Sequence, residues 1–442
     1  MATSRRTVMA MAAGVGAAVG LAACGASGGG GQGPPKAGGP PRLVTLSKTQ
    51  SSAAKEVAWS ETFQQAEKST GIKITVTVEP SDTYWDKRQA EFAGGVTNAD
   101  IIYNQPNWVL GGALAGMFAD LMPYFKRDKV DLNQYYKNDL DAWSWKEKLY
   151  GFPFQIEGET VFYNKTLLTA KGVPFPKSDW STDDLLQAAQ RANDPAKNVF
   201  GLLVENTTIQ YSFGTFIRLF GGPVFSDARD KALYGDDPKS IQGGTYLAEL
   251  STKYAVTPTA EATKALPQGT RAMEGRLVAM AIGDISRHQD IRNALGTENV
   301  DFTPTPKGPS GARSARVYSN NWSILSLSKA RDAAWDLLKW THSKEGLSGP
   351  QLRAIGWPPV KWASQAPVWM DTFKGTHIAD VQKLWEASGH DQAELPEGSQ
   401  ALTIANEPLT RMLRGELTPR DAMKESADKV NDLFSKRPPA WK

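Results

Sequence analysis

Two carboxylates separated by one residue, Glu157 and Glu159 in "FQIEGE", form a pair that could in principle carry out acid–base chemistry. On one strand they would share a face, and a glycoside hydrolase needs two carboxylates roughly 5–10 Å apart. Nothing nearby marks one as an acid and the other as a nucleophile. The histidines are scattered, and neither an H-E-x-x-H zinc pattern nor a phosphate-binding loop occurs. The sequence therefore predicts a protein that is not an enzyme and that uses no cofactor and no metal.

Aromatic and amide side chains gather in segments that are predicted to follow strands. In open α/β sheets, ligands bind beyond the carboxyl ends of the strands. Aromatic rings can cover the C–H face of a sugar, while carboxylates, amides and arginine bond its hydroxyls. The candidate ligand contacts are the rings of Trp108, Trp322 and Trp357, the second aromatic pair Tyr84 and Trp85, and the polar groups of Gln105, Asn107, Glu157, Asp284, Asn320, Asn321 and Arg353.

Each candidate also has a purely structural interpretation. Tryptophan more often packs in a core or at its rim than it contacts a ligand. Glu157 can pair with a nearby lysine, and Asp284 can cap the turn after its strand. Arg353 can bridge two lobes. The sequence leaves these alternatives open.

The elements that would position these residues alternate between strand and helix. Alternating or continuous apolar runs predict strands at residues 71–80, 99–104, 159–164, 276–284 and 321–328. Helical spacing recurs between them, and Ser181 with Asp184 forms a capping-box pattern at the start of one helix. Alternation of this kind favours an α/β fold with mostly parallel sheets.

The N-terminal segment predicts export and anchoring. Arg5 and Arg6 precede an apolar run of small residues that has the length of a signal peptide's hydrophobic region, and the paired arginines are typical of twin-arginine signals. "LAAC" resembles the bacterial lipobox, which implies that Cys24, the only cysteine, is lipidated and becomes the new N-terminus. We therefore expect a signal peptide at residues 1–23, possible export by the Tat route, and a glycine- and proline-rich tether at residues 24–41. The alternative is an ordinary signal peptide cleaved near the same position.

Size and charge limit the function further. At 442 residues the chain exceeds a usual single domain, so two lobes are expected. The formal net charge of +3 gives no reason to expect a nucleic-acid partner, which normally needs a basic patch.

Several stretches together resemble the extracellular solute-binding proteins (family 1) of bacterial ABC importers, the group of maltose-binding-type proteins. They include "GMFADLMPYF", "KLYGFPFQIEGETVFYNKTLL", "EGRLVAMAIGD" and "WSILSLSKARDAAWDLLKWTHSKEG". Each motif is modest, but they occur in the family's order over residues 55–350. The resemblance implies a two-lobed periplasmic-binding-protein-like fold (type II), in which each lobe is a mostly parallel sheet flanked by helices and crossing strands form the hinge. It places lobe 1 at residues 42–152 and 284–320, and lobe 2 at residues 153–283 and 321–442. The crossings are expected near residues 150–154, near Asp284 and near residues 319–322.

The resemblance also implies a function. A monomer, held by its lipid at the extracellular face of the cell membrane, would capture a mono- or oligosaccharide or another small polar solute and deliver it to the membrane subunits of an ABC permease. The alternatives are a peptide or polyamine ligand, a sensor kinase as partner, and an extracellular glycoside hydrolase. One segment departs from the family pattern: "GDIS" stands where many members carry Gly-x-Trp. This departure argues against a maltodextrin-like ligand.

Overall fold

The computed structural model describes residues 42–51, 53–267, 271–349, 351–352, 355–388 and 395–438. By its internal contacts the chain divides into two units, Met1–Pro40 and Pro41–Lys442. The predicted signal peptide, Cys24 and the tether lie outside the described residues, and so does Arg353.

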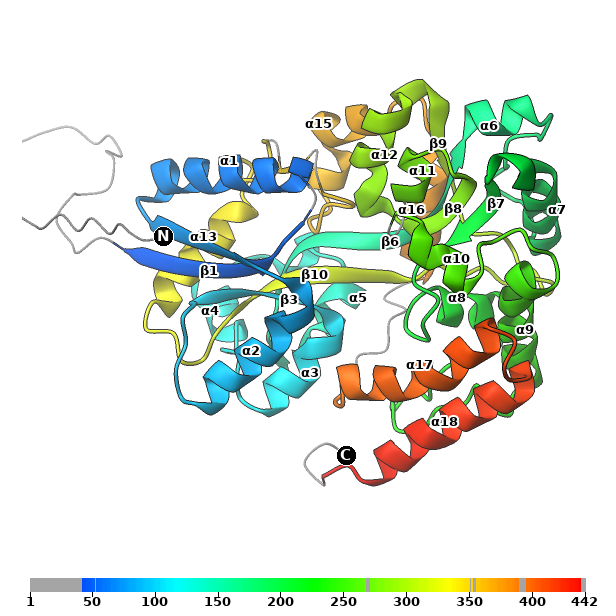
Figure 1. Cartoon of the computed structure of the whole chain (residues 1–442). Coiled ribbons are helices and arrows are strands. Elements are labelled where there is room, and N and C mark those ends of the chain that lie inside the picture. Colours follow the sequence, from blue (N-terminus) through cyan, green and yellow to red (C-terminus); the bar gives the residue numbers. More distant parts are fainter. Residues whose placement is uncertain are drawn as a thin grey trace, which may run out of the picture. The chain divides into compact units, whose positions relative to one another are not determined.

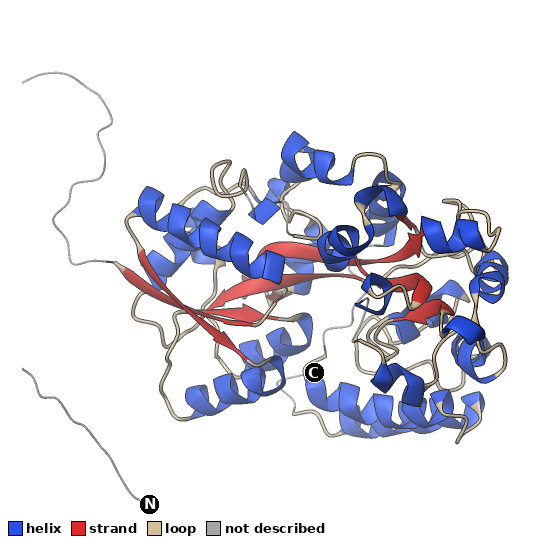
Figure 2. Cartoon of the chain, turned by 45° about the horizontal axis from the view of Figure 1, so that its top comes forward, coloured by secondary structure: helices blue, strands red, loops and turns tan. Residues whose placement is uncertain are grey.

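Strands form the centre of the second unit, and helices cover both faces of the main sheet (Figures 1 and 2). The strands are β1 (Leu43–Thr49), β2 (Lys73–Glu79), β3 (Ile101–Asn104), β4 (Ser144–Trp145), β5 (Lys148–Leu149), β6 (Phe152–Asn164), β7 (Phe200–Val204), β8 (Val278–Asp284), β9 (Val300–Thr303) and β10 (Val317–Ile324).

Most helices are short or of medium length. The α-helices are α1 (Ala53–Thr70), α2 (Ser81–Ala93), α3 (Pro106–Leu114), α4 (Met122–Arg127), α5 (Lys137–Ala142), α6 (Lys165–Ala170), α7 (Thr182–Ala192), α8 (Ser212–Leu219), α9 (Pro238–Thr252), α10 (Ala260–Ala265), α11 (Arg271–Glu274), α12 (His288–Leu295), α13 (Arg331–Thr341), α15 (Pro367–Met370), α16 (Ile378–Ser388), α17 (Ser399–Leu413) and α18 (Pro419–Ser435). Short 3₁₀ turns are η1 (Leu132–Gln134), η2 (Pro195–Lys197), η3 (Ile285–Arg287), η4 (Thr297–Asn299), η5 (Ala363–Gln365) and η6 (Asp371–Phe373).

The main sheet has the strand order β2-β1-β3-β10-β6-β8-β7, with β9 also paired to β6. The outer strands are parallel, as predicted: β1 pairs with β2 and β3, and β7 pairs with β8. The pairings that involve β6 and β10 are antiparallel. The fold is thus the predicted two-lobed α/β fold, with a first lobe built on β1–β3 and a second lobe built on β7–β9.

Two long strands, β6 and β10, connect the lobes across the middle of the molecule (Figure 1). β6 pairs with β10 through Phe152–Gly158 and then with β8 from Glu159 onward. Every residue of β6 is buried, including Gln155, Glu157 and Glu159. Polar side chains are rarely buried unless they have a structural or binding role, so this strand is where we look for a functional site.

Local sequence explains several element boundaries. Ser181 and Asp184 form the predicted capping box at the start of α7, with both reciprocal hydrogen bonds present. Gly158 lies where β6 passes from one lobe to the other. A Cβ atom there would lie 2.2 Å from the Trp385 ring, so only glycine lets this tryptophan of α16 pack against the strand.

Two segments lie in the other lobe from the one that the sequence suggested. β9, within residues 284–320, pairs with Val161–Asn164 of β6 and therefore belongs to the second lobe. α13, within residues 321–442, packs against α1 and β1 of the first lobe. The reason is that the chain returns to the first lobe along β10, whereas β8 ends at Asp284 and leads into η3 and α12.

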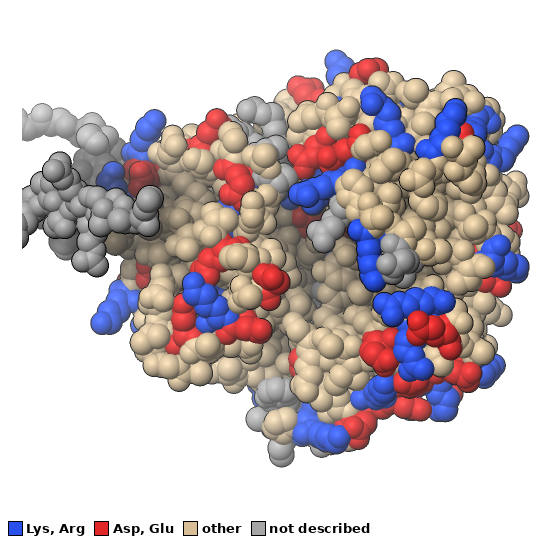
Figure 3. Space-filling model, in the orientation of Figure 1, with Lys and Arg blue, Asp and Glu red and all other residues tan. Residues whose placement is uncertain are grey.

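Acidic and basic side chains are interspersed over the visible surface (Figure 3). Among the described residues, no helix combines the length and the apolar character that a membrane crossing requires.

Candidate functional site

A polar cavity lies between the ends of the first lobe's strands and one face of β6 and β10. Its volume is about 190 Å³. We call it the cleft cavity; its lining residues are Lys48, Thr49, Gln50, Ser51, Lys55, Trp59, Tyr103, Phe154, Gln155, Glu157, Tyr318, Asn320 and Trp322. β1 and β3 direct their carboxyl ends to it, which is where α/β sheets bind ligands.

The second lobe contributes an adjoining polar cluster. Tyr211, Ser212, Asp284 and Arg316 meet here with Glu159, at the carboxyl ends of β7 and β8. Arg316, just before β10, and Tyr318 and Asn320 on it are spaced by two residues, so they share the face that carries Glu157 and Glu159 on β6. The cleft cavity and this cluster therefore form one continuous polar face.

Glu157 is the most unusual group of this face. Its side chain is 2 % exposed, and Oε1 accepts a hydrogen bond from Gln155 and lies 3.5 Å from Nζ of Lys55. Oε2 makes no hydrogen bond of normal geometry among the described residues. Burial raises the pKa of Glu157, the charge of Asp284 raises it further, and Lys55 opposes both effects. The Ser286 side chain beside the carboxylate also favours its ionised form and so lowers its pKa. A buried carboxylate oxygen without a well-formed hydrogen bond is a strong acceptor for a ligand hydroxyl.

Glu159, by contrast, is fully used by the protein. Its carboxylate accepts hydrogen bonds from Ser212 Oγ at 2.6 Å, Thr215 Oγ1 at 2.5 Å and the backbone N–H of Arg316 at 3.1 Å. The two carboxylates that looked equivalent in sequence thus differ: one is a structural acceptor within the second lobe, and the other is available to a ligand.

Arg316 lies between two aromatic rings. Its guanidinium carbon is 3.9 Å from the ring centre of Tyr211 and 4.0 Å from that of Tyr318. Nη2 lies 2.5 Å from Oδ1 of Asp284, and the Tyr318 hydroxyl donates to Oδ2 at 3.3 Å. Cation–π contacts and the ion pair hold this charge in place and neutralise it.

The predicted aromatic platforms lie in the core. Trp108 is 7 % exposed and stacks on Trp85, with ring centres 5.2 Å apart and planes at 1°, and on Tyr84 at 5.8 Å. Tyr84 donates its hydroxyl hydrogen to the Ser47 carbonyl. These three rings pack on one another at the edge of the first lobe, and none of them lines the cleft cavity.

The segment "SNNW", expected at a crossing between the lobes, lies inside β10, which begins four residues before the strand predicted at residues 321–328. Trp322 does line the cleft cavity, yet it is 1 % exposed and stacks on Phe154 at 4.5 Å. Asn321 points to the other face, where it donates to Ser319 Oγ at 2.7 Å. The predicted strand began too late because the polar residues Ser319 and Asn320 resemble a loop by composition.

Two amides that follow β3 behave differently, Gln105 just before α3 and Asn107 in its first turn. Nε2 of Gln105 donates to the hydroxyl of Tyr103, which donates in turn to Oδ1 of Asn320. Gln105 thus reaches the edge of the cleft cavity. Asn107 instead donates to Ser399 Oγ at 3.3 Å, at the start of α17, so it joins the two lobes.

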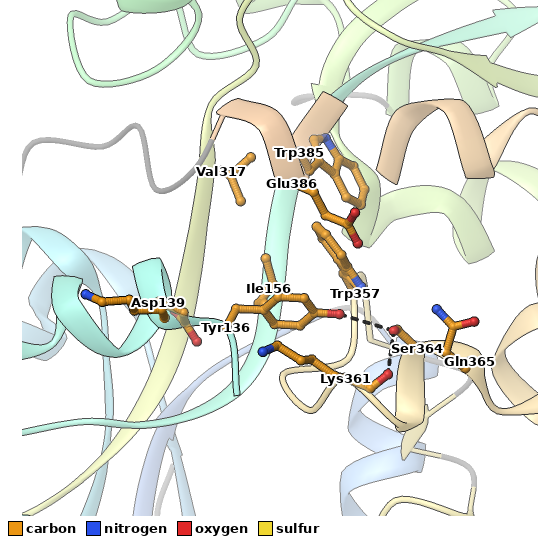
Figure 4. A pocket seen from close by; sticks show the side chains of 11 residues that line it. Tyr136, Asp139, Ile156, Val317, Trp357, Lys361, Ser364, Gln365, Trp385 and Glu386 are labelled. Carbon is orange, nitrogen blue, oxygen red and sulfur yellow. Dashed lines mark hydrogen bonds between the residues drawn. The ribbon is translucent and has the colours of Figure 1, made fainter. Parts of the chain in front are cut away.

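Trp357 lies on the opposite side of the crossing strands from Glu157. It lines a cavity of about 500 Å³, which we call the back pocket, together with Tyr136, Ile156, Val317 and Trp385 (Figure 4). Ile156 and Val317 alternate with Glu157 and Tyr318 along their strands, so they face away from the cleft cavity. The Tyr136 hydroxyl donates to Ser364 Oγ at 3.1 Å.

The structure adds site residues that the sequence did not single out. They are Lys55, Tyr103, Gln155, Tyr211, Arg316 and Tyr318. The available signal was a period of two in polar residues within strands that are otherwise apolar. Within the described ranges, no group of three or more His, Cys, Asp or Glu side chains is placed to hold a metal ion.

Comparison with known families and proteins gives consistent matches. Residues 61–375 match the model of a family described as bacterial extracellular solute-binding protein. An erythritol/L-threitol-binding protein of Mycolicibacterium smegmatis is 24 % identical over 66 % of this chain, and the match spans only 65 % of that protein's length. A galactooligosaccharide-binding protein of Bacillus subtilis is 22 % identical, with 88 % of this chain and 91 % of the relative covered.

Among solved structures, an ABC substrate-binding protein from Listeria monocytogenes in complex with cycloalternan superposes with a TM-score of 0.77. The two are 21 % identical, and the match covers 89 % of this chain and 99 % of the other. At this identity the likeness establishes the two-lobed fold. The matched family and these relatives are binding proteins.

Proposed function

The chain belongs to the family of bacterial extracellular solute-binding proteins, and on that premise we propose that it captures a sugar or polyol between its lobes and delivers it to an ABC permease. The solute leaves unchanged, because the protein only binds it. Erythritol and galactooligosaccharides, named for the two relatives, are both neutral and rich in hydroxyl groups.

The observation that carries this proposal is the polar face of β6 and β10. Glu157 offers a buried oxygen that lacks a hydrogen bond of normal geometry, and the hydroxyls of Tyr103 and Tyr318 lie on the same cavity. Hydroxyl groups both donate and accept, so a polyhydroxylated solute can satisfy such a mixed set. A peptide or a polyamine would instead need partners for its own charges.

Binding would shift the protein toward its closed form. The polar face belongs partly to each lobe, so a solute that contacts both lobes favours closure by its differential affinity. A micromolar affinity corresponds to about 8 kcal/mol, which a few hydrogen bonds to hydroxyls can supply.

Anchoring at the extracellular face of the membrane through a lipid on Cys24 belongs to the same proposal. The lipobox-like segment and the glycine-rich tether in the sequence support this anchoring. Mass spectrometry of the N-terminal peptide from membranes should find acyl chains on Cys24, and Cys24→Ala should release the protein into the medium. An unmodified, soluble Cys24 form in the parent would contradict the anchor.

A thermal-shift screen of the full chain against sugars, polyols, amino acids, polyamines and short peptides tests the capture of solutes. A ligand that binds only the folded state raises Tm by mass action. A rise with a sugar or polyol that chromatography recovers unchanged supports the proposal. A rise with a peptide or polyamine alone, or recovery of a cleaved sugar, overturns it.

A further inference from the structure

We infer that the solute is a small neutral polyol or a single monosaccharide, and not an oligosaccharide or a charged solute. This inference rests on the proposed function and names its substrate class. It is carried by the size of the cleft cavity, the state of its aromatic rings and the pairing of its charges.

The cleft cavity is small, and the two lobes of the protein already contact each other beside it. Drug-sized ligands occupy pockets of roughly 300–1,000 Å³, whereas the cleft cavity measures about 190 Å³. The first lobe meets the second where Asn107 bonds Ser399 and where the Asn107 carbonyl oxygen would lie 2.4 Å from a Cβ on Gly398. This contact leaves no space for a second sugar unit between α3 and α17 at that point.

The tryptophans of the site cannot stack on a sugar ring. Trp59 and Trp322 line the cavity but are 5 % and 1 % exposed. Trp59 is stacked on Phe63 and Trp322 on Phe154. Oligosaccharides bind largely by packing against exposed aromatic rings. Because Trp59 and Trp322 are buried, the site favours a solute that is held by hydrogen bonds alone.

The charges of the polar face are already compensated. Arg316 is paired with Asp284, Lys55 lies 3.5 Å from Glu157, and Glu159 is satisfied by three donors. A phosphorylated sugar, a sugar acid or a polyamine would have to displace one of these partners and leave a buried charge unpaired. A neutral solute needs no such exchange.

The remaining groups suit vicinal hydroxyls. The carboxylate of Glu157 and the polar side chains of Tyr103, Gln155, Tyr318 and Asn320 line the same small space and together offer donors and acceptors. A carbon chain of about four to six atoms, with a hydroxyl on each carbon, matches that density of partners.

Calorimetric titration of the full chain with a size series tests the inference. The probes are erythritol, ribitol, sorbitol, galactose, a galactose disaccharide and trisaccharide, and galactonate as the charged analogue. We expect a polyol or galactose to bind at least about 100-fold more tightly than either oligosaccharide and than galactonate. Glu157→Gln should weaken the best ligand at least about 10-fold, while Glu386→Gln, at the exposed rim of the back pocket, should leave its affinity unchanged.

The outcomes separate the inference from the function on which it rests. Binding of an oligosaccharide or galactonate as tightly as the small probes overturns the inference but keeps sugar capture. If no sugar or polyol binds, and a peptide or polyamine does, both are overturned. Loss of affinity in Glu386→Gln with none in Glu157→Gln would move the site to the back pocket and overturn the inference.

Discussion

The buried Arg316 and the part-buried Asp284 form an ion pair, with Nη2 and Oδ1 2.5 Å apart, that joins the residue just before β10 to the end of β8. The Tyr211 and Tyr318 rings cover the guanidinium on either side. This arrangement fixes the second-lobe half of the polar face and removes its charge from the cavity. The neighbouring Glu157 is left as the group that can respond to a ligand.

Replacing Arg316 with Met should destabilise the fold. The substitution removes the ion-pair partner of the part-buried Asp284 carboxylate, which keeps only the Tyr318 hydroxyl as a donor, so the cost should lie below the about 3–5 kcal/mol that is typical of a fully buried pair. Urea unfolding followed by tryptophan fluorescence measures the free energy of unfolding. Adding Asp284→Asn to Arg316→Met should recover much of the loss, because no unpaired charge then remains. A loss below about 1 kcal/mol in the single variant would mean that the pair does not stabilise the crossing.

Replacing Glu157 with Gln should weaken solute binding and leave the fold intact. The amide keeps the shape but turns one acceptor into a donor, and the loss of a hydrogen bond to a charged group costs about 1.5–3 kcal/mol of binding energy. Calorimetry with the best ligand of the screen gives the affinity. Unfolding in urea should show a change of no more than about 1 kcal/mol, because the loss of the attraction to Lys55 is offset by the loss of the carboxylate's desolvation cost. An unchanged affinity would show that this carboxylate does not contact the solute.

Affinity should rise with pH. Burial and Asp284 raise the pKa of Glu157 in the free protein, and ligand hydroxyls that donate to the carboxylate favour its ionised form. At pH values below that pKa, binding releases a proton, so the affinity increases with pH by at most about tenfold per pH unit. At pH values above that pKa, the affinity no longer changes with pH. Titrations from about pH 5 to about pH 8 test this. The dependence should disappear in Glu157→Gln, and its persistence there would assign it to another group.

Replacing Trp357 with Ala should cost stability more than affinity. The ring packs between Tyr136, at 4.9 Å, and Trp385, at 5.2 Å, on the face away from Glu157. Removal of a buried tryptophan typically costs about 3–5 kcal/mol. We expect the unfolding free energy to fall by that amount while the solute affinity changes less than about tenfold. A larger loss of affinity than of stability would restore Trp357 to the ligand contacts.

Acid should destabilise the protein through two buried histidines. Burial lowers the pKa of His288 to about 3, helped by Arg292 and Lys55, and burial lowers that of His342 to about 3. From about pH 6.5 down toward pH 3, the unfolded chain binds protons that the folded chain does not, so the free energy of unfolding falls as pH falls. Each histidine contributes up to about 1.4 kcal/mol per pH unit.

The variant His288→Leu isolates one of these contributions. Its unfolding free energy minus that of the parent should grow by up to about 1.4 kcal/mol for each pH unit below about 6. Urea unfolding at several pH values measures this difference. A difference that is constant with pH would mean that His288 is protonated in the folded protein.

The sequence predicted most elements because their signals are local, whereas the two lobes were expected from chain length and from the family resemblance. The alternation in residues 71–80, the capping box at Ser181 and the apolar run ending at Asp284 each depend on neighbours in the chain. The site was harder to predict, because it depends on pairing between distant strands. The bulge between Asn320 and Asn321 decides which side chains of β10 face the cleft cavity. That register is set by contacts with β3 and β6, about which residues 317–324 alone carry no information.

Tryptophans mislead for a related reason. Trp85 and Trp108 are far apart in sequence, so no local pattern predicts that they stack. In the structure their rings cover each other on the faces that we expected to contact a sugar. The polar residues buried in β6 were the better signal. Glu157 was a candidate because its segment was expected at a lobe crossing, whereas Arg316 and Tyr318 required the knowledge that β10 lies beside β6.

A crystal structure of the complex with the tightest solute tests the central claim most directly. We predict density for one small solute in the cleft cavity, within hydrogen-bond distance of Glu157 and Tyr318, with the Arg316–Asp284 pair unbroken. Solute density in the back pocket beside Tyr136 and Trp357, with the cleft cavity holding only water, would contradict the account.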